Sequence, residues 1–478
     1  MHRYSRLALF LSLSLGVSNL LAAQPSRPRP EASFVRVSPR DTRYFELSSG
    51  RPYIPIGLNM IAPPSSDEEQ GLKQMEEWMQ ALHENGGNFF RIWLSNGFFD
   101  VEHEKSGFYD PAMAKRIDRV LDMAARNELR VKLTLEHFRH FFREEQKWAA
   151  KPLHHVSQGG PAADESDFFS GQASREQFKR KLDWFAGRYG SNPTVFAWEL
   201  WNEINAVRGQ GWEDWTAVML GELHTRFPKN LVTQSLGSFD TDRVREKYRW
   251  LALLPKNDFA QVHRYLDLGA SLEICHGPVD GLAADAVKEL LVLNPGKPVI
   301  LAESGAVEPR HTGPFKLYAK DKAGIILHDV LFAPFFAGAA GAGQIWHWDQ
   351  YVAANNLWFQ FRSFAEAVRG IDPPAEDFRP VEISHDRLTV RALDGRKTIL
   401  IWCRDKANNW MTELANGQPP EILPHALLGL APAIRLPGKA RVLRFYDPWT
   451  DRWSKGETDG TTVVLPAFSR SLVVKIER

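Results

Sequence analysis

The chain has 478 residues, of which 44% are hydrophobic and 24% charged, with a formal net charge of +1. This length leaves room for two or three domains, or for one large barrel with a smaller domain. The near-neutral charge gives no basic footprint, which argues against nucleic acid or an anionic membrane surface as a partner. The composition is therefore that of an ordinary globular protein.

The amino-terminal segment, residues 1–23, has the pattern of a secretory signal peptide. Two arginines precede an apolar run over residues 7–21, and two alanines follow it as a cleavage site. The run is short for a membrane span, which needs about 20 residues. We expect cleavage near Ala23, a flexible leader over residues 24–34, and a secreted protein, periplasmic or extracellular, with no membrane span after cleavage.

The two cysteines, Cys275 and Cys403, are far apart in the sequence. One disulfide is compatible with an exported protein, but the spacing favours two unpaired, buried thiols. The sequence has no CxxC motif and no histidine spacing typical of zinc ligands, so we expect no structural metal and no cofactor. We also expect a monomer.

Eight apolar segments of strand length follow one another along the chain, separated by loops and amphipathic helical stretches. Helices are predicted over residues 68–84, 112–128 and 175–190. The strand candidates are residues 53–59, 88–94, 130–138, 194–203, 230–237, 259–266, 297–305 and 341–348. They are continuous apolar runs with little alternation, which is typical of a parallel sheet covered by helices.

Eight such units predict an α/β protein with a (β/α)8 TIM barrel over residues 35–370, preceded by a short amino-terminal hairpin. A doubly wound sheet is the alternative, but the glycine-rich phosphate motif that would support it is missing after the first strand. A Pro-rich hinge follows at residues 370–380. Beyond it, alternating apolar runs without helices predict a small antiparallel β-sandwich domain over residues 378–478, which carries no catalytic motif.

Functional residues of such a barrel lie at the carboxyl ends of its strands. In this chain those positions hold Arg91, Trp93, Glu136, His137, Asn202, Glu203, His263, Tyr265, Glu303, Trp346 and Trp348. The glutamates that end the fourth and seventh strands would face each other across the barrel mouth. Cleavage of a glycosidic bond needs such a pair, one carboxyl group neutral and the other charged.

This set of residues resembles clan A of the glycoside hydrolases, and most closely family 5, the cellulase and mannanase family. The resemblance spans roughly residues 35–370. The residues that match the pattern, in strand order, are Arg91, His137, Asn202, Glu203, His263, Tyr265, Glu303 and Trp346. The chain reads Asn-Glu-Ile-Asn where many members have Asn-Glu-Pro.

The resemblance implies a retaining double displacement, with Glu203 as the acid/base and Glu303 as the nucleophile. Tyr265 would donate a hydrogen bond to Glu303, and the fixed charge of Arg91 would keep that carboxylate ionised.

Five further residues would bind or orient the substrate. Asn202 is suited to bonding the sugar 2-hydroxyl, while His263 and His137 would orient the acid or the substrate. Trp346, with Trp348 nearby, offers an apolar platform under the sugar ring.

Two other glutamates near these strand ends are interpreted as structural. Glu199 would lie deeper in the barrel, facing the same way as Trp201 and paired with a cation. Glu136 is expected to point outward or to form an ion pair.

Four residues outside the strand ends also resemble site residues. The adjacent His154 and His155 resemble a metal pair only superficially, because neighbouring residues of a strand face opposite ways. Trp212 and Trp215 would either form a sugar subsite or pack a loop on the next helix.

Three functions follow from these observations. The leading hypothesis is a secreted retaining hydrolase of a β-linked polysaccharide or oligosaccharide, mannan-like or glucan-like. The segments "WELWNEIN" and "IWHWDQ" resemble mannanase-type members. The second is a metal-dependent barrel hydrolase with His137, His263 and the glutamates as ligands, which lacks the usual early HxH motif. The third is a catalytically silent carbohydrate-binding barrel, against which the presence of both carboxyl groups argues.

Overall fold

The computed structural model describes residues 33–137, 152–436 and 442–478, so the predicted signal peptide lies outside the described residues. The chain enters through a small antiparallel sheet of β1 (Val35–Val37), β2 (Phe45–Leu47) and β3 (Pro52–Tyr53). The Phe45 ring packs edge-on against Phe196 and Phe259, with centroid distances of 5.3 and 5.7 Å. The predicted hairpin is thus a three-stranded sheet in contact with barrel strands.

Parallel strands form a barrel in chain order. A five-stranded sheet contains β4 (Gly57–Asn59), β5 (Phe89–Trp93), β6 (Arg130–Glu136), β7 (Val195–Trp201) and β8 (Leu231–Thr233). Next along the chain, β9 (Ala260–His263) pairs with β10 (Val299–Glu303). Ile345 forms parallel bridges to both Leu58 and Ser304, which joins the last strand segment to the first. The predicted (β/α)8 TIM barrel is confirmed.

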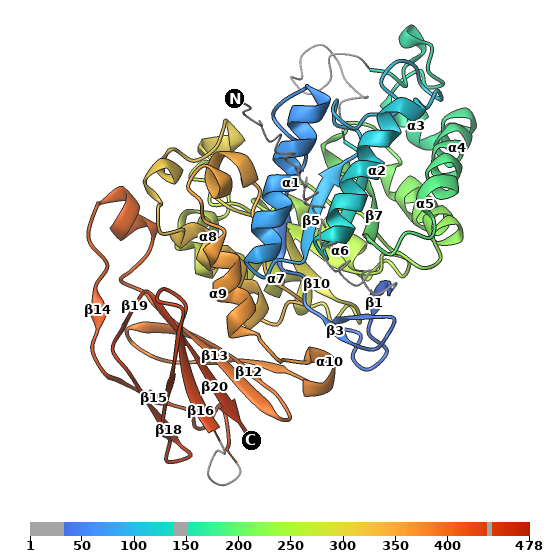
Figure 1. Cartoon of the computed structure of the whole chain (residues 1–478). Helices are drawn as coiled ribbons and strands as arrows, with labels where there is room; N and C mark the ends of the chain where they lie inside the picture. Colours follow the sequence, from blue (N-terminus) through green and yellow to red (C-terminus); the bar gives the residue numbers. More distant parts are fainter. Residues whose placement is uncertain (1–32, 138–151, 437–441) are drawn as a thin grey trace, which may run out of the picture. The chain divides into compact units, whose positions relative to one another are not determined.

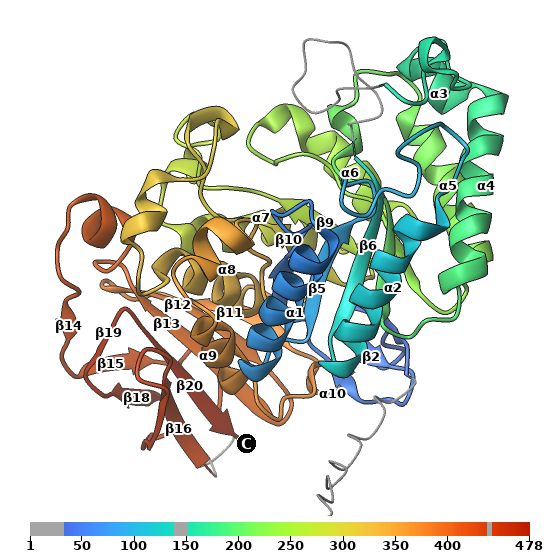
Figure 2. The ribbon, with the colours of Figure 1, turned by 45° about the horizontal axis from the view of Figure 1, so that its top comes forward.

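Helices surround the strands (Figures 1 and 2). They are α1 (Glu68–Glu84), α2 (Pro111–Arg126), α3 (Glu165–Ser170), α4 (Gln172–Tyr189), α5 (Trp212–Arg226), α6 (Arg245–Leu253), α7 (Val279–Leu291), α8 (Ile325–Phe336), α9 (Phe359–Ala367) and α10 (Pro373–Glu376). Local sequence sets where the first two begin. Asp67 accepts a hydrogen bond from the Gln70 backbone at the start of α1, and Asp110 caps α2, whose first residue is proline.

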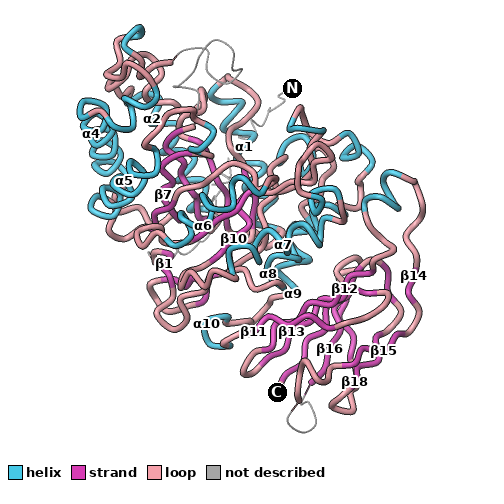
Figure 3. The backbone as a smooth tube through the Cα atoms, turned by 180° about the vertical axis from the view of Figure 1, so that it is seen from behind, coloured by secondary structure: helices cyan, strands magenta, loops and turns pink. Residues whose placement is uncertain are grey.

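The last hundred residues form antiparallel sheets (Figure 3). A six-stranded sheet has the order β11 (Arg379–Ile383), β12 (Leu388–Asp394), β13 (Thr398–Asp405), β20 (Ser471–Glu477), β16 (Val442–Asp447) and β17 (Arg452–Lys455). Two short pairs accompany it, β14 (Ile422–Leu423) with β19 (Phe468–Ser469) and β15 (Ala426–Gly429) with β18 (Thr462–Leu465). The antiparallel region expected after residue 378 is present; its description as a sandwich domain stays a prediction.

The six-stranded sheet contacts the barrel through α8, all of whose residues are buried. The Trp402 ring of β13 stacks on Phe332, with centroids 5.8 Å apart. Arg404, also on β13, donates two hydrogen bonds to the Asp329 carboxylate, at 2.7 and 3.1 Å, and both side chains are only 2% exposed. This buried ion pair and the rings around it join the carboxyl-terminal sheet to the barrel.

Cys275 and Cys403 are both free and buried, as the sequence analysis favoured. Within the residues that the structure describes, no helix combines the length and the apolar character that crossing a membrane requires.

Candidate active site

Glu203 and Glu303 lie at the carboxyl ends of β7 and β10. Glu203 follows β7 in a left-handed backbone conformation, with φ 53° and ψ 51°, and its N–H donates to Ser235 Oγ at 3.1 Å. A residue other than glycine rarely adopts this conformation, and such strained positions cluster at active sites. The Glu203 side chain is 20% exposed and that of Glu303 only 4%. The two carboxyl groups therefore differ in their access to solvent.

His263 lies between the two carboxyl groups. Its Nδ1 is 2.9 Å from Glu203 Oε1, a hydrogen bond, and 3.3 Å from Glu303 Oε2. One oxygen of each glutamate and one nitrogen of the histidine all lie within 4.8 Å of one another. Burial, together with the charge of Arg91, holds the pKa of His263 well below its usual range, so the imidazole is neutral. This hydrogen bond would let His263 orient Glu203, one of the two roles expected for it.

Arg91 and Tyr265 hold both oxygens of Glu303. Arg91 Nη1 donates to Oε1, and the Tyr265 hydroxyl donates to Oε2 at 2.8 Å. The same guanidinium donates through Nη2 to Asn202 Oδ1 at 2.7 Å. Arg91 is fully buried, so its charge acts on Glu303 with little screening by solvent.

The two carboxyl groups differ in the balance of their pKa shifts. Burial raises the pKa of Glu203 well above its usual range, and the neighbouring charge of Glu303 raises it further. Burial also raises the pKa of Glu303, but Arg91 and Tyr265 offset part of that rise by stabilising the charged form. These surroundings favour the neutral form of Glu203 and the charged form of Glu303.

A polar network in the barrel interior fixes Arg91 from below. Arg91 Nε donates to Glu199 Oε2 at 2.8 Å, and Gln261 Nε2 donates to Glu199 Oε1 at 3.0 Å. Lys132 lies 3.8 Å from Glu199, and burial lowers the pKa of its amine to about 7. The predicted pairing of Glu199 with barrel cations is confirmed. Lys132 and Gln261 were not predicted, although a lysine inside the apolar strand "RVKLTLE" is a visible signal.

The predicted common orientation of Glu199 and Trp201 is wrong. Glu199 points into the barrel, whereas the Trp201 ring packs against Phe168 of α3 and Trp215 of α5, with centroids 5.9 and 6.1 Å apart. Arg91 and its partners fill the interior at this level, and the large indole lies between strand and helices instead. Trp215 is thus a core residue, and Trp212 is buried against a ring of α6, so both pack rather than line a subsite.

Aromatic side chains line another part of the mouth. The His137 ring stacks on Trp93 at 4.9 Å, and His137 Nδ1 bonds Ser95 Oγ at 2.7 Å. Trp93 also contacts Trp346, whose ring lies 5.3 Å away, and Trp348 packs edge-on against Trp346 at 5.7 Å. Trp346 and Trp348 are both partly exposed. The residues predicted from the strand ends therefore gather at one end of the barrel.

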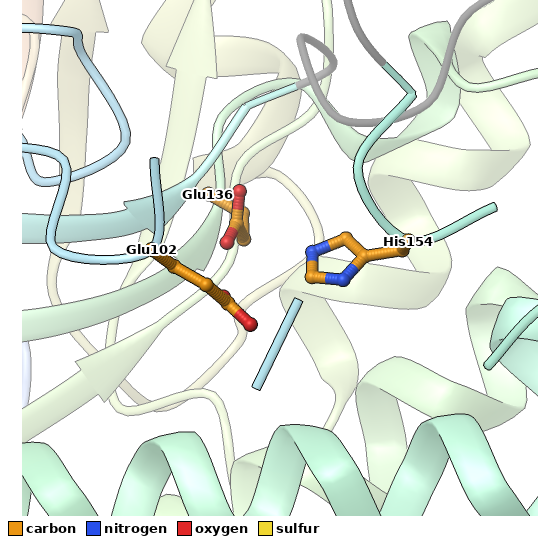
Figure 4. Close-up of side chains that lie close together, drawn as sticks. All are labelled: Glu102, Glu136 and His154. Atoms are coloured by element: carbon orange, nitrogen blue, oxygen red, sulfur yellow. The ribbon is translucent and has the colours of Figure 1, made fainter. Parts of the chain in front are cut away.

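A second buried cluster contains Glu102, Glu136 and His154 (Figure 4). Lys181 of α4 donates to Glu102 Oε2 at 2.9 Å and also to Glu136. The ammonium group thus supplies the positive charge that these carboxylates need, and the predicted ion pair of Glu136 is confirmed. His155 bonds Ser157 instead, so the two adjacent histidines share no site.

A (β/α)8 barrel in which a buried and a half-buried carboxyl group meet at the ends of the strands has the architecture of a barrel glycoside hydrolase. The family model described as cellulase (glycosyl hydrolase family 5) matches residues 57–323. The chain belongs to glycoside hydrolase family 5, as the resemblance predicted.

The chain is also similar to individual proteins. Mannan endo-1,4-beta-mannosidase 7 of Arabidopsis thaliana is 24% identical over 341 residues, which cover 63% of this chain and 74% of the relative. Mannan endo-1,4-beta-mannosidase 3 of rice, Oryza sativa subsp. japonica, is 28% identical over 261 residues, 48% and 54% of the two chains. A solved family 5 structure from Bacteroides vulgatus superposes with a TM-score of 0.59 at 14% identity, covering 93% of this chain and 94% of that one.

Proposed function

We propose that the protein is a secreted, retaining β-glycoside hydrolase that cleaves β-1,4-linked mannan or its oligosaccharides. The carboxyl pair of Glu203 and Glu303 carries this proposal, because a neutral and a charged carboxyl group side by side are the reacting groups of such an enzyme. The choice of mannan rests on the mannosidase names of the relatives and on the mannanase-like segments at residues 198–205 and 345–350.

In the proposed mechanism Glu203 protonates the glycosidic oxygen while the Glu303 carboxylate attacks the anomeric carbon. A covalent glycosyl-enzyme forms, and Glu203 then removes a proton from the water that hydrolyses it. One oxygen of each carboxyl group lies within 4.8 Å of the other. This proximity supports retention, for which the carboxyl groups lie about 5–5.5 Å apart, over inversion, which needs about 6.5–9.5 Å.

The neighbouring residues support these roles. Arg91 and Tyr265 orient the Glu303 carboxylate and favour its charged form, as a nucleophile requires. Asn202 is fixed by its hydrogen bond to Arg91 and would bond the sugar 2-hydroxyl. The partly exposed ring of Trp346 would support the sugar at the cleavage point.

A metal-dependent reaction at the same place fits the contacts less well. Glu203, His263 and Glu303 are close enough to share a cation. However, both oxygens of Glu303 already accept hydrogen bonds from Arg91 and Tyr265, and a cation would lie beside a buried guanidinium. A silent carbohydrate-binding barrel would have no need of the unequal environments of the two glutamates.

The test is a panel of linear mannan, galactomannan, glucomannan, β-1,4-glucan and mannooligosaccharides, read by released reducing ends. We expect hydrolysis of the mannans, retained in excess EDTA, with proton NMR showing the β-anomer as the first product. The control is Glu303→Ala, which should release nothing. Absence of hydrolysis from every substrate, loss of activity in EDTA, or an α-anomer as first product would overturn the proposal.

A further inference from the structure

A third group of side chains lies on three successive loops of the barrel, after β8, β9 and β10. It consists of Asp240, Asp267 and His311, each offering one oxygen or nitrogen atom within 4.8 Å of the others. The group lies next to the catalytic residues, because the His311 ring packs edge-on against Tyr265, with centroids 5.0 Å apart. Lys181 bonds both carboxylates of the Glu102 and Glu136 cluster, whereas within the described residues no lysine forms an ion pair with Asp240 or Asp267.

Asp267 is buried and presents one oxygen to this group. Its Oδ1 accepts hydrogen bonds from the backbone N–H groups of Gly269, at 2.7 Å, and Arg310, at 2.9 Å, which fix the carboxylate. Its Oδ2 faces His311 Nε2 at 3.7 Å, too far for a hydrogen bond. Within residues 33–137, 152–436 and 442–478, no donor is bonded to this oxygen, although the side chain is only 2% exposed.

One carboxylate oxygen of Asp240 lies within 4.8 Å of the donor atoms of Asp267 and His311. No side chain in the described part of the molecule donates a hydrogen bond to its carboxylate. The nearby guanidinium of Arg264 donates to the Phe239 carbonyl at 2.7 Å and to Asp285 at 2.5 Å, and its buried Nη2 bonds neither Asp240 nor Asp267. The Asp240 and Asp267 carboxylates therefore lie close together with no cationic side chain hydrogen-bonded to either of them among the described residues. Such an arrangement costs free energy.

His311 completes a set of metal donors. Among the described residues, the only hydrogen bond of its Nε2 is a long one, 3.4 Å, to Ser238 Oγ. Zinc binds imidazole nitrogen and carboxylate oxygen at about 2.0–2.2 Å, so two tetrahedral ligands lie about 3.4 Å apart. The 3.7 Å between His311 Nε2 and Asp267 Oδ2 is close to that separation.

We propose that Asp240, Asp267 and His311 form a binding site for a divalent transition-metal cation, with water completing its coordination. Two carboxylates and one imidazole are the donor set that Zn²⁺ and Mn²⁺ accept, whereas Ca²⁺ prefers oxygen alone. The His311 side chain is 37% exposed, which gives the cation access from solvent. Bound there, the cation would link the loops after β8, β9 and β10 beside Tyr265. It takes no part in the proposed bond cleavage.

The test is cation binding by the full chain, measured apart from hydrolysis. Protein stripped with EDTA and dialysed is titrated with ZnCl₂, MnCl₂ or CaCl₂ by calorimetry, and bound metal is counted by mass spectrometry. We expect one equivalent of Zn²⁺ or Mn²⁺, with a higher thermal unfolding midpoint, and weaker binding of Ca²⁺. Asp240→Asn and His311→Gln should each weaken Zn²⁺ binding at least tenfold. Asp267 is left intact because it also holds the backbone of its loop.

Two control variants distinguish this site from the other clusters. Glu203→Gln alters the catalytic group and Glu102→Gln the cluster that contains Lys181, and both should bind Zn²⁺ as the unchanged protein does. The proposal fails if neither Zn²⁺ nor Mn²⁺ binds at one equivalent. It also fails if Asp240→Asn and His311→Gln bind normally, or if Glu203→Gln or Glu102→Gln abolishes binding. Because the readout is bound metal, a failure here leaves the proposed hydrolysis untouched, and the reverse also holds.

Discussion

Replacing Glu203 by alanine separates the two chemical roles proposed for the carboxyl pair. Arg91 and Tyr265, which hold Glu303, make no hydrogen bond to Glu203, so the nucleophile keeps its partners in this variant. The variant then loses the acid and base help of Glu203, while the nucleophile stays in place. Such help contributes typically about 10²–10⁴-fold, or about 2.7–5.4 kcal/mol of the activation free energy. We expect a loss of that size on polysaccharide.

The assay compares this substrate with a dinitrophenyl β-glycoside, whose leaving group departs without a proton. On the dinitrophenyl substrate the first step of Glu203→Ala should survive, and turnover should stall at the glycosyl-enzyme. Added azide should enter the vacated space, restore turnover and yield the β-glycosyl azide. In Glu303→Ala no covalent intermediate can form, so any azide product should have the inverted configuration.

The reasoning is refuted if both variants give azide products of the same configuration. It is also refuted if Glu203→Ala loses the dinitrophenyl substrate as completely as the polysaccharide, since the acid is not needed there. Retention of full polysaccharide activity by Glu203→Ala would likewise remove Glu203 from its role.

Three further predictions concern pH, stability and export. The acid must hold its proton, and the pKa of Glu203 is raised, so polysaccharide activity should fall as pH rises through that pKa. The pH profile of Glu203→Gln on the dinitrophenyl substrate should lack this fall. The same fall in that variant would contradict the prediction. Arg404→Ala leaves the buried Asp329 charge without its partner and should lower the free energy of unfolding by about 3–5 kcal/mol in urea titrations. Arg119→Ala, at an exposed ion pair, should cost at most about 1 kcal/mol, and equal losses would refute the contrast. Amino-terminal sequencing of exported protein should begin just after Ala23, and an intact initiator methionine would exclude cleavage there.

Much of the barrel and of the catalytic pair could be read from local sequence. Eight apolar segments in order predict parallel strands, and parallel strands of a barrel have all their carboxyl ends at one mouth. Glu203 and Glu303, which follow such segments, therefore had to come together although they are far apart in the chain. The spacing of His263 and Tyr265 likewise placed both on one face, and both lie within reach of Glu303.

Contacts between segments distant in sequence were decided by the tertiary structure. Alternation along a strand predicts the direction of a side chain only where the strand is regular and the space inside is free. Arg91 and its partners occupy the barrel interior near Trp201, and the Trp201 ring faces the helices instead. Lys181, which supplies a positive charge to Glu136, lies on helix α4. The register of this helix against β6 cannot be predicted from any local sequence pattern. Asp240, Asp267 and His311 meet for the same reason. Each lies on a different loop, and only the closed barrel brings those loops together.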